Sequence, residues 1–249
     1  MSGYNDFAQF YDRLTGNVSY GDMAVLFDKL IKEYSSENEV VVDLACGTGS
    51  LTAELGKLGY DVIGVDSSED MLSEAYAKAD GMEGVSFLCQ DMRELSLWGA
   101  ADVVVCVLDS LNHLDSEKAL EETFSAVSDH VCDGGLFIFD LNTEYKHRKV
   151  LADNAFCYDM EGLFCSWQNE LNEEDGSVHI SLDFFEEQKD GSYQRLSEDF
   201  TEWLYPDALV MRLLSAYEFE LIGRFDGFSE EPVKEDSQRV MYVCRRLNR

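Results

Sequence analysis

The sequence predicts an α/β protein, with a mostly parallel sheet flanked by helices and a small antiparallel β insertion after the fifth strand. Three observations favour this class. A strand, a glycine turn and the start of a helix follow each other directly over 39–58. Short apolar runs then alternate with helical patterns up to about residue 142, as in parallel sheets. Between 156 and 204 the pattern changes to polar–apolar alternation, which is typical of antiparallel strands.

The clearest motif lies between residues 39 and 52, in the stretch EVVVDLACGTGSLT. An apolar run of strand length, 40–44, is interrupted only by Asp43 and leads straight into ACGTG. Leucines then recur at helical spacing at 51, 55 and 58. Gly47 and Gly49 allow the positive φ, or the close approach of a ligand, that so tight a turn needs.

Two more acidic residues follow the next two predicted strands. Asp66 ends the apolar run 60–65, close to the spacing of about 20 residues at which an acid reaches ribose hydroxyls. Asp91 follows the run 85–88. Parallel sheets bind ligands at the carboxyl ends of their strands, so we expect these side chains and Asp43 to meet at one ligand site.

The run Asp43-Leu44-Ala45-Cys46-Gly47-Thr48-Gly49 resembles the first motif, Asp-x-x-x-Gly-x-Gly, of the class I S-adenosylmethionine (SAM) methyltransferases. The resemblance implies a Rossmann-like seven-stranded sheet, S-adenosyl-L-methionine as cofactor and S-adenosyl-L-homocysteine (SAH) as product. A turn that binds NAD is the alternative. Thr52 stands where the dinucleotide motif G-x-G-x-x-G needs a third small residue, which counts against it, as do the additional acids.

The resemblance also implies roles for single residues. It places Asp66 on the ribose hydroxyls, Ser67 and Met71 beside the adenine, and Asp91 at the adenine amino group with the Met92 backbone at the ring edge. A helix cap is the other interpretation of Asp91. The cofactor-binding residues expected in this way are Tyr4, Tyr11, Tyr20, Asp43, Ala45, Cys46, Gly47, Gly49, Asp66, Ser67, Met71, Gln90, Asp91, Met92 and Leu108.

The N-terminal segment carries Tyr4, Phe7, Ala8 and Tyr11 at helical spacing, and a second apolar helix face runs from about residue 23 to 34. The stretch 4–12 is similar to a Tyr-x-x-x-Ala-x-x-Tyr-Asp segment that lies over the cofactor pocket in related methyltransferases. It implies a lid whose tyrosines contact the methionine part of SAM. Simple packing of these aromatic rings onto the core is the alternative.

The segment after the fourth predicted strand, 103–108, is where the family places residues that face the sulfonium and the acceptor. The chain has only two prolines, Pro206 and Pro232, so it lacks the Asn/Asp-Pro-Pro-Tyr turn of amino-methylating enzymes that act on bases. The Pro-Cys motif of the 5-methylcytosine enzymes is absent as well. The remaining catalytic candidates are His113, Asp109 and Tyr11, each a potential general base.

The rest of the chain completes the predicted fold. A helix over 120–127 leads to a fifth strand at 136–141. Three antiparallel strands then form the insertion, and a helix after Pro206 precedes a closing hairpin at 218–225 and 239–245. The expected divisions are an N-terminal helical lid (1–38), a SAM-binding Rossmann-like domain (39–153 and 205–249) and an insertion that covers the active site (154–204).

Composition limits the function further. Only 19 basic residues face 50 acidic ones, and the net charge of −31 makes nucleic acid an unlikely partner. Seven cysteines without a regular framework favour a reducing cytoplasm and no metal site. No apolar run is long enough to span a membrane, and the N-terminus lacks an apolar signal segment. We therefore expect a cytoplasmic monomer or homodimer with a small-molecule substrate.

These observations together predict a methyltransferase that moves a methyl group from SAM to a nitrogen or oxygen nucleophile by direct in-line displacement. A non-catalytic SAM- or SAH-binding regulatory or partner protein is the alternative, because it would keep the same cofactor residues.

Overall fold

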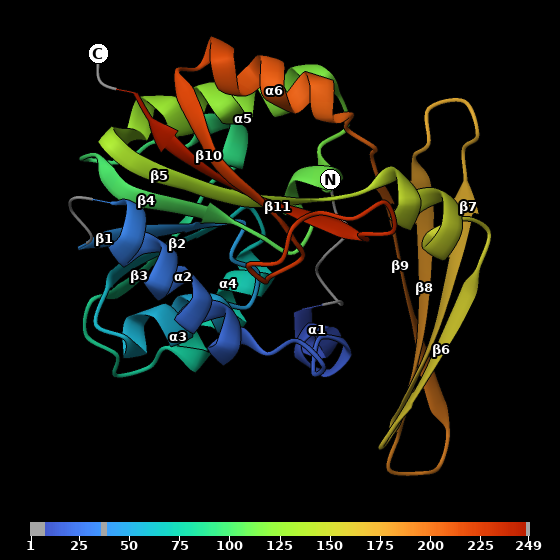
Figure 1. The fold of residues 1–249 in the computed structure, drawn as a ribbon. Coiled ribbons are helices and arrows are strands. Elements are labelled where there is room, and N and C mark those ends of the chain that lie inside the picture. Colours follow the sequence, from blue (N-terminus) through green and yellow to red (C-terminus); the bar gives the residue numbers. More distant parts are fainter. Residues whose placement is uncertain (1–7, 36–38, 248–249) are drawn as a thin grey trace.

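The computed structural model describes residues 8–35 and 39–247, arranged around one seven-stranded sheet (Figure 1). The strand order is β10-β11-β5-β4-β1-β2-β3. The strands β1 to β5 run parallel to one another, whereas β11 pairs antiparallel with both β5 and β10. The strands are β1 (Val40–Leu44), β2 (Asp61–Asp66), β3 (Val85–Cys89), β4 (Ala101–Cys106), β5 (Val131–Asn142), β10 (Phe219–Asp226) and β11 (Arg239–Arg246).

Helices cover both faces of this sheet, as its almost entirely buried central strands require. One apolar core lies under α5 and α6, the other under α2 and α3, and a smaller cluster joins α4 to Phe87 of β3. The helices are α1 (Ala8–Leu14), α2 (Tyr20–Tyr34), α3 (Ser50–Lys57), α4 (Glu69–Lys78), α5 (Glu117–His130) and α6 (Asp207–Ala216). The predicted fold class is confirmed. No helix within the described ranges is long and apolar enough to cross a membrane.

A second, antiparallel sheet stands beside the main body (Figure 1). Its order is β6-β7-β8-β9, with β6 (Ala155–Met160), β7 (Leu163–Leu171), β8 (Val178–Glu187) and β9 (Tyr193–Glu202). The prediction of three strands was wrong by one. The missed strand, β6, is the outer strand and is mostly exposed, so it carries no alternation of apolar and polar residues.

The two N-terminal helices pack in different places. The buried face of α2, which includes Phe27 and Ile31, belongs to the core of the main sheet. In contrast, α1 packs on the insertion sheet, where Phe10 stacks on Phe184 at 5.2 Å, and reaches the start of α4 at Met71. The division into lid, main domain and insertion stays a prediction.

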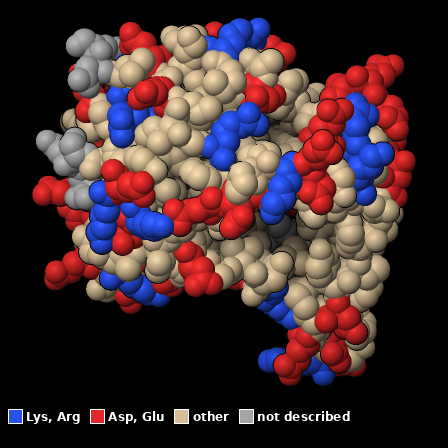
Figure 2. Space-filling model, viewed as in Figure 1, with Lys and Arg blue, Asp and Glu red and all other residues tan. Residues whose placement is uncertain are grey.

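Acidic side chains are spread over the face of the molecule shown in Figure 2, with fewer basic ones between them. The same view shows a hollow between the main body and the lower part of the insertion sheet.

Candidate functional site

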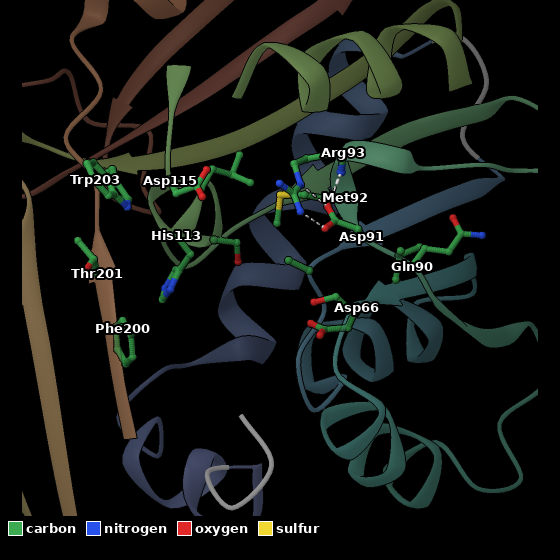
Figure 3. A pocket seen from close by; sticks show the side chains of 15 residues that line it. Asp66, Gln90, Asp91, Met92, Arg93, His113, Asp115, Phe200, Thr201 and Trp203 are labelled. Atoms are coloured by element: carbon green, nitrogen blue, oxygen red, sulfur yellow. Dashed lines mark hydrogen bonds and ion pairs between the residues drawn. The ribbon is translucent and has the colours of Figure 1, made fainter. Parts of the chain in front are cut away.

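A cavity of about 440 Å³ opens at the carboxyl ends of β2, β3 and β4 (Figure 3). Its walls come from the main sheet on one side and from the end of β9 on the other, so residues about 100 positions apart in the chain face each other. The lining residues are Ala45, Val65, Asp66, Ser67, Gln90, Asp91, Met92, Arg93, Ser110, His113, Leu114, Asp115, Phe200, Thr201 and Trp203.

The glycine turn after β1 has the conformation that its sequence predicts. Gly47 and Gly49 adopt φ values of 53° and 70°. A Cβ on Gly49 would lie 2.9 Å from Cβ of Ala75 and 3.1 Å from the Phe87 ring, so only glycine fits between α4 and β3. The Gly47 N–H points instead at the neighbouring strand, where it donates to Asp66 Oδ2 at 2.8 Å.

Asp66 is held at the cavity wall by backbone donors. Besides the Gly47 N–H, the Ser68 N–H donates to its Oδ1 at 2.9 Å. Burial raises the pKa of Asp66, and these backbone hydrogen bonds oppose the rise. Each carboxylate oxygen keeps a further lone pair, and Figure 3 shows the side chain at the cavity, so Asp66 can accept hydrogen bonds from a hydroxylated ligand there.

Asp43 and Thr52 form a buried pair behind the turn. The Thr52 hydroxyl donates to Asp43 Oδ2 at 2.5 Å, and both side chains are buried. Burial raises the pKa of Asp43 to about 6, which the hydrogen bond from Thr52 partly opposes. Thr52 therefore has a structural reason to replace the third glycine of a dinucleotide motif, because it supplies the donor that this acid needs.

The sequence allowed two roles for Asp91, a contact to the adenine and a helix cap, and the structure shows that it caps a helix. Its Oδ1 accepts from the Arg93 N–H at 2.9 Å, at the start of the short helix η1 (Met92–Glu94). It also forms an ion pair with the Arg93 guanidinium, which lowers the pKa of Asp91 (Figure 3). Gln90 differs, because its side-chain amide is bonded to the Ser96 backbone and points away from the cavity (Figure 3).

A second, smaller cavity of about 20 Å³ adjoins the first and shares Ala45 and Ser110 with it. The two predicted tyrosines that the structure describes, Tyr11 and Tyr20, face it together with the turn and the segment after β4. Burial raises the pKa of Tyr20. The lining residues are Tyr11, Tyr20, Asp43, Ala45, Cys46, Thr48, Ser50, Leu51, Val107, Leu108 and Ser110.

α1 is tied to the glycine turn as well as to the insertion sheet. Asp12 Oδ1 accepts from the Thr48 hydroxyl at 2.6 Å, and its carboxylate also pairs with Lys78 at 2.8 Å. These bonds hold the helix that carries Tyr11 against the turn.

Among the described residues, three of the predicted cofactor residues, Met71, Gly47 and Gly49, line neither cavity. Met71 is buried between α1, α4 and the insertion sheet. Tyr4 lies outside the described residues. Gly47 and Gly49 act through their backbone.

His113 stands where the insertion meets the main body (Figure 3). It ends the short helix η2 (Ser110–His113) and lines the large cavity, with its ring centroid 4.9 Å from that of Phe200. Burial lowers the pKa of His113, although the nearby Asp109 carboxylate opposes this. Its imidazole is therefore neutral near pH 7, which is the form that can accept a proton.

Asp109 does not fit the role of a general base. Its carboxylate lines neither cavity and forms an ion pair with the Arg239 guanidinium, which also pairs with Asp140. Burial alone would raise the pKa of Asp109, but the positive charges of Arg239 and Lys146 lower it below its usual range. A carboxylate held in this way is a poor proton acceptor, which argues against Asp109 as the general base.

Of the cavity residues of the insertion, the sequence singles out only Trp203, as an aromatic side chain that could contact a substrate, with packing onto the sheet as the favoured interpretation. It did not identify Phe200 and Thr201. The Trp203 backbone bonds to Asn112 in both directions, since its N–H donates to the Asn112 carbonyl at 2.7 Å and its carbonyl accepts from Asn112 Nδ2 at 2.8 Å. The end of β9 is thereby fixed to η2. The only sequence signal was the group of aromatic residues near the end of the insertion.

Comparisons with known proteins agree with this geometry. A family model described as "Methyltransferase domain" matches residues 41–135. A protein of Geobacillus sp. (strain WCH70) named "Putative methyltransferase" is 31% identical over 245 residues, which are 98% of this chain and 99% of that protein. A glycine/sarcosine N-methyltransferase of Parasynechococcus marenigrum (strain WH8102) is 27% identical over 237 residues, covering 91% of this chain and 78% of its own length.

A solved structure extends the likeness to three dimensions. The crystal structure of a S-adenosylmethionine-dependent methyltransferase from Clostridium acetobutylicum ATCC 824 matches with a TM-score of 0.88 and 32% sequence identity. The match covers 98% of this chain and 99% of that one.

Proposed function

This chain belongs to the class I SAM-dependent methyltransferases, and on that basis we propose that it methylates a small molecule at a nitrogen or oxygen atom. The observation that carries the proposal is the cavity, which joins the carboxyl ends of the parallel strands to the end of β9. One wall offers carboxylates to a cofactor, and the opposite wall offers aromatic side chains and an imidazole to an acceptor (Figure 3).

In this proposal the cofactor spans the two adjoining cavities. Asp66 accepts hydrogen bonds from the ribose hydroxyls, and Asp91 accepts one from the adenine amino group through the oxygen that does not cap η1. Tyr11 and Tyr20 then lie on the side of the methionine chain, at the small cavity. Ala45 and Ser110 line both cavities, so they mark the place where the two parts of the ligand meet.

SAM supplies an activated methyl group, so the protein forms no covalent intermediate. What the protein contributes is position, which can lower a barrier by roughly 7–11 kcal/mol. The acceptor lies between the sulfonium and the residues Phe200, Thr201 and Trp203. His113, which is neutral because burial lowers its pKa, takes the proton from the acceptor and so frees the lone pair that attacks the methyl carbon. The C–S bond then breaks and SAH leaves with its electron pair.

An amine is the acceptor that we favour. The net charge of −31 produces a negative potential that attracts cations, and an ammonium group becomes a nucleophile once His113 removes its proton. The likeness to a glycine/sarcosine N-methyltransferase supports the same choice. A hydroxyl acceptor is the second candidate, since it would use the same base.

The test is transfer of a radiolabelled methyl group from SAM to a panel of small amines, amino acids, amino sugars and alcohols. We expect transfer to one amine class, with kcat reduced at least tenfold in His113→Gln. His130→Gln is the matched control, because His130 lies at the end of α5 outside both cavities. If the protein binds SAM but transfers no methyl group across the panel, the non-catalytic SAM- or SAH-binding protein becomes the better account.

A further inference from the structure

A network of three charged side chains, of which Asp140 is fully buried and the other two are partly buried, surrounds the start of η2. Arg239, the first residue of β11, directs one guanidinium nitrogen at Asp140 Oδ2 and the other at Asp109 Oδ1. The same Asp140 oxygen accepts from the Asp109 N–H at 3.0 Å. Both the backbone and the side chain of Asp109 are therefore fixed from β5 and β11.

The residue held in this way lies in an unusual stretch of backbone. Leu108 and Asp109 adopt left-handed conformations with φ of 59° and 58°, which residues with a Cβ rarely take up. Such conformations persist only where the surroundings enforce them, and they concentrate at functional sites. The Asp140 carboxylate and the Arg239 guanidinium hold the N–H and the side chain of Asp109. The Asp109 carbonyl also accepts from the Asn112 N–H at 2.7 Å.

The same stretch sets the position of side chains in both cavities. Leu108 faces the small cavity, Ser110 faces both, and His113 faces the large one. Arg239 itself lines neither cavity. A change in the conformation of Leu108 and Asp109 would move all three lining residues at once.

Stability alone does not explain the arrangement. Two carboxylates, one fully and one partly buried, share one guanidinium, and Asp140 Oδ1 has no hydrogen-bond partner among the described residues. Buried ionic groups of this kind are often no better for stability than apolar side chains of the same volume. The Arg239 side chain is further fixed by Phe228, whose ring centroid lies 5.3 Å from the guanidinium carbon.

We propose that Arg239 is a positioning residue, which, through Asp109 and Asp140, sets the conformation of residues 108–113 for binding of the cofactor. This inference rests on the proposed function, because it assigns the adjoining cavities to SAM. Lysine cannot replace Arg239 fully, because a single ammonium group lacks the planar fork that reaches two carboxylates.

The test measures two quantities for each variant, the dissociation constant for SAH by calorimetry and the melting temperature, and compares each with the wild-type value. Arg239→Met is expected to weaken SAH binding at least tenfold, and Arg239→Lys to restore part of the loss. The matched control is Arg224→Met, because Arg224 lies on the same hairpin, pairs with Asp207 at 3.1 Å and stacks on Tyr242, away from both cavities. It should lower the melting temperature but leave SAH binding unchanged.

A second variant separates position from charge. The double change Asp109→Asn with Arg239→Met removes one negative and one positive charge together, so the net charge is unchanged, and circular dichroism checks that the variant is folded. Weak SAH binding by this folded double variant supports the proposal. Normal binding by it, or by Arg239→Met, overturns the proposal, and so does an equal loss in Arg224→Met. Failure of the wild-type protein to bind SAH would instead overturn the proposed function.

Discussion

Three buried or partly buried carboxylates near the site are each stabilised by a different kind of partner. Asp43 accepts from the Thr52 hydroxyl, Asp109 pairs with Arg239, and Glu202 Oε2 accepts from Asn142 Nδ2 at 2.6 Å. A neutral donor stabilises a charge less than a guanidinium does. Burial raises the pKa of Asp43 and of Glu202, whereas at Asp109 the combined positive charges of Arg239 and Lys146 outweigh burial and lower the pKa.

Removal of the Thr52 hydroxyl, which donates to Asp43, should show how much this hydrogen bond contributes to the stability of the fold. Thr52→Val keeps the side-chain shape but leaves a buried carboxylate without its side-chain donor, so we expect a loss of about 1–3 kcal/mol in the free energy of unfolding. The loss should be larger at pH 8 than at pH 5, because Asp43, with a pKa of about 6, is ionised only at the higher pH.

Urea unfolding at the two pH values measures this effect. Thr123→Val is the control, since the Thr123 hydroxyl is buried but donates only to the Ala119 carbonyl of its own helix. An equal loss in both variants at both pH values would contradict the account of Asp43.

Glu202 should make the stability of the protein depend on pH. Burial raises its pKa from 4.5 to about 7, so between these values the folded protein holds a proton that the unfolded chain releases. The stability that this proton brings is complete below pH 4.5 and is lost as the pH rises through 7, by at most about 3 kcal/mol. Glu202→Gln, which has no titrating proton, should show a shallower decline.

Urea unfolding between pH 5 and pH 8 compares Glu202→Gln with the wild type. The Asp43 carboxyl titrates in both proteins, so the difference between the two curves isolates Glu202. Parallel curves for the two proteins would refute the assignment.

At the scale of elements, the cavity depends on two segments that the chain brings together over a long distance. η2 follows β4 of the main sheet, β9 ends the insertion, and Asn112 joins them through its bonds to Trp203. The strand β9 therefore has two functions, since it closes the second sheet and forms the wall opposite the carboxylates.

An acceptor held by this wall should respond to a change in β9 separately from the cofactor. Phe200→Ala is expected to raise KM for the acceptor about tenfold, which corresponds to about 1.4 kcal/mol, while the dissociation constant for SAH stays near the wild-type value. Phe185→Ala is the control, because Phe185 packs against Phe164 in the same sheet and lines neither cavity. If Phe200→Ala weakens SAH binding and leaves KM unchanged, the wall belongs to the cofactor instead.

The main sheet could be predicted from sequence because its signals are local. Apolar runs, the glycine turn and the acids at or near the ends of β1, β2 and β3 each lie within a few residues. In contrast, residues that contact each other at the site lie far apart in the sequence. Asp109 resembled a candidate base because Arg239, which holds it, lies 130 positions away. Likewise, nothing in the local pattern of Phe200 or Trp203 shows that the insertion folds back onto η2.

At the scale of the whole molecule, the net charge is −31, and acidic side chains are spread over the face shown in Figure 2. Several ion pairs between described residues are exposed at both ends, and such pairs contribute little. Repulsion between like charges should therefore dominate the electrostatics of folding.

Added salt should then stabilise the protein. Raising the ionic strength from about 0.01 M to about 0.15 M shortens the Debye length from about 30 Å to about 8 Å, which screens long-range repulsion. We expect a rise of several degrees in the melting temperature with either sodium or potassium chloride. A melting temperature that falls with salt would show that specific ion pairs outweigh the net charge.

The assignment of the cavity to SAM is tested most directly by asking whether cofactor binding depends on Asp66. Calorimetric titration of SAM, SAH and NAD into the wild type, Asp66→Asn and Asp61→Asn compares the two acids at opposite ends of β2, of which only Asp66 lines the cavity. The account predicts that the wild type binds SAM and SAH but not NAD, that Asp66→Asn weakens this binding at least tenfold, and that Asp61→Asn leaves it unchanged. Folded wild-type protein that binds neither sulfur compound, or that binds them as tightly after Asp66→Asn, would contradict it.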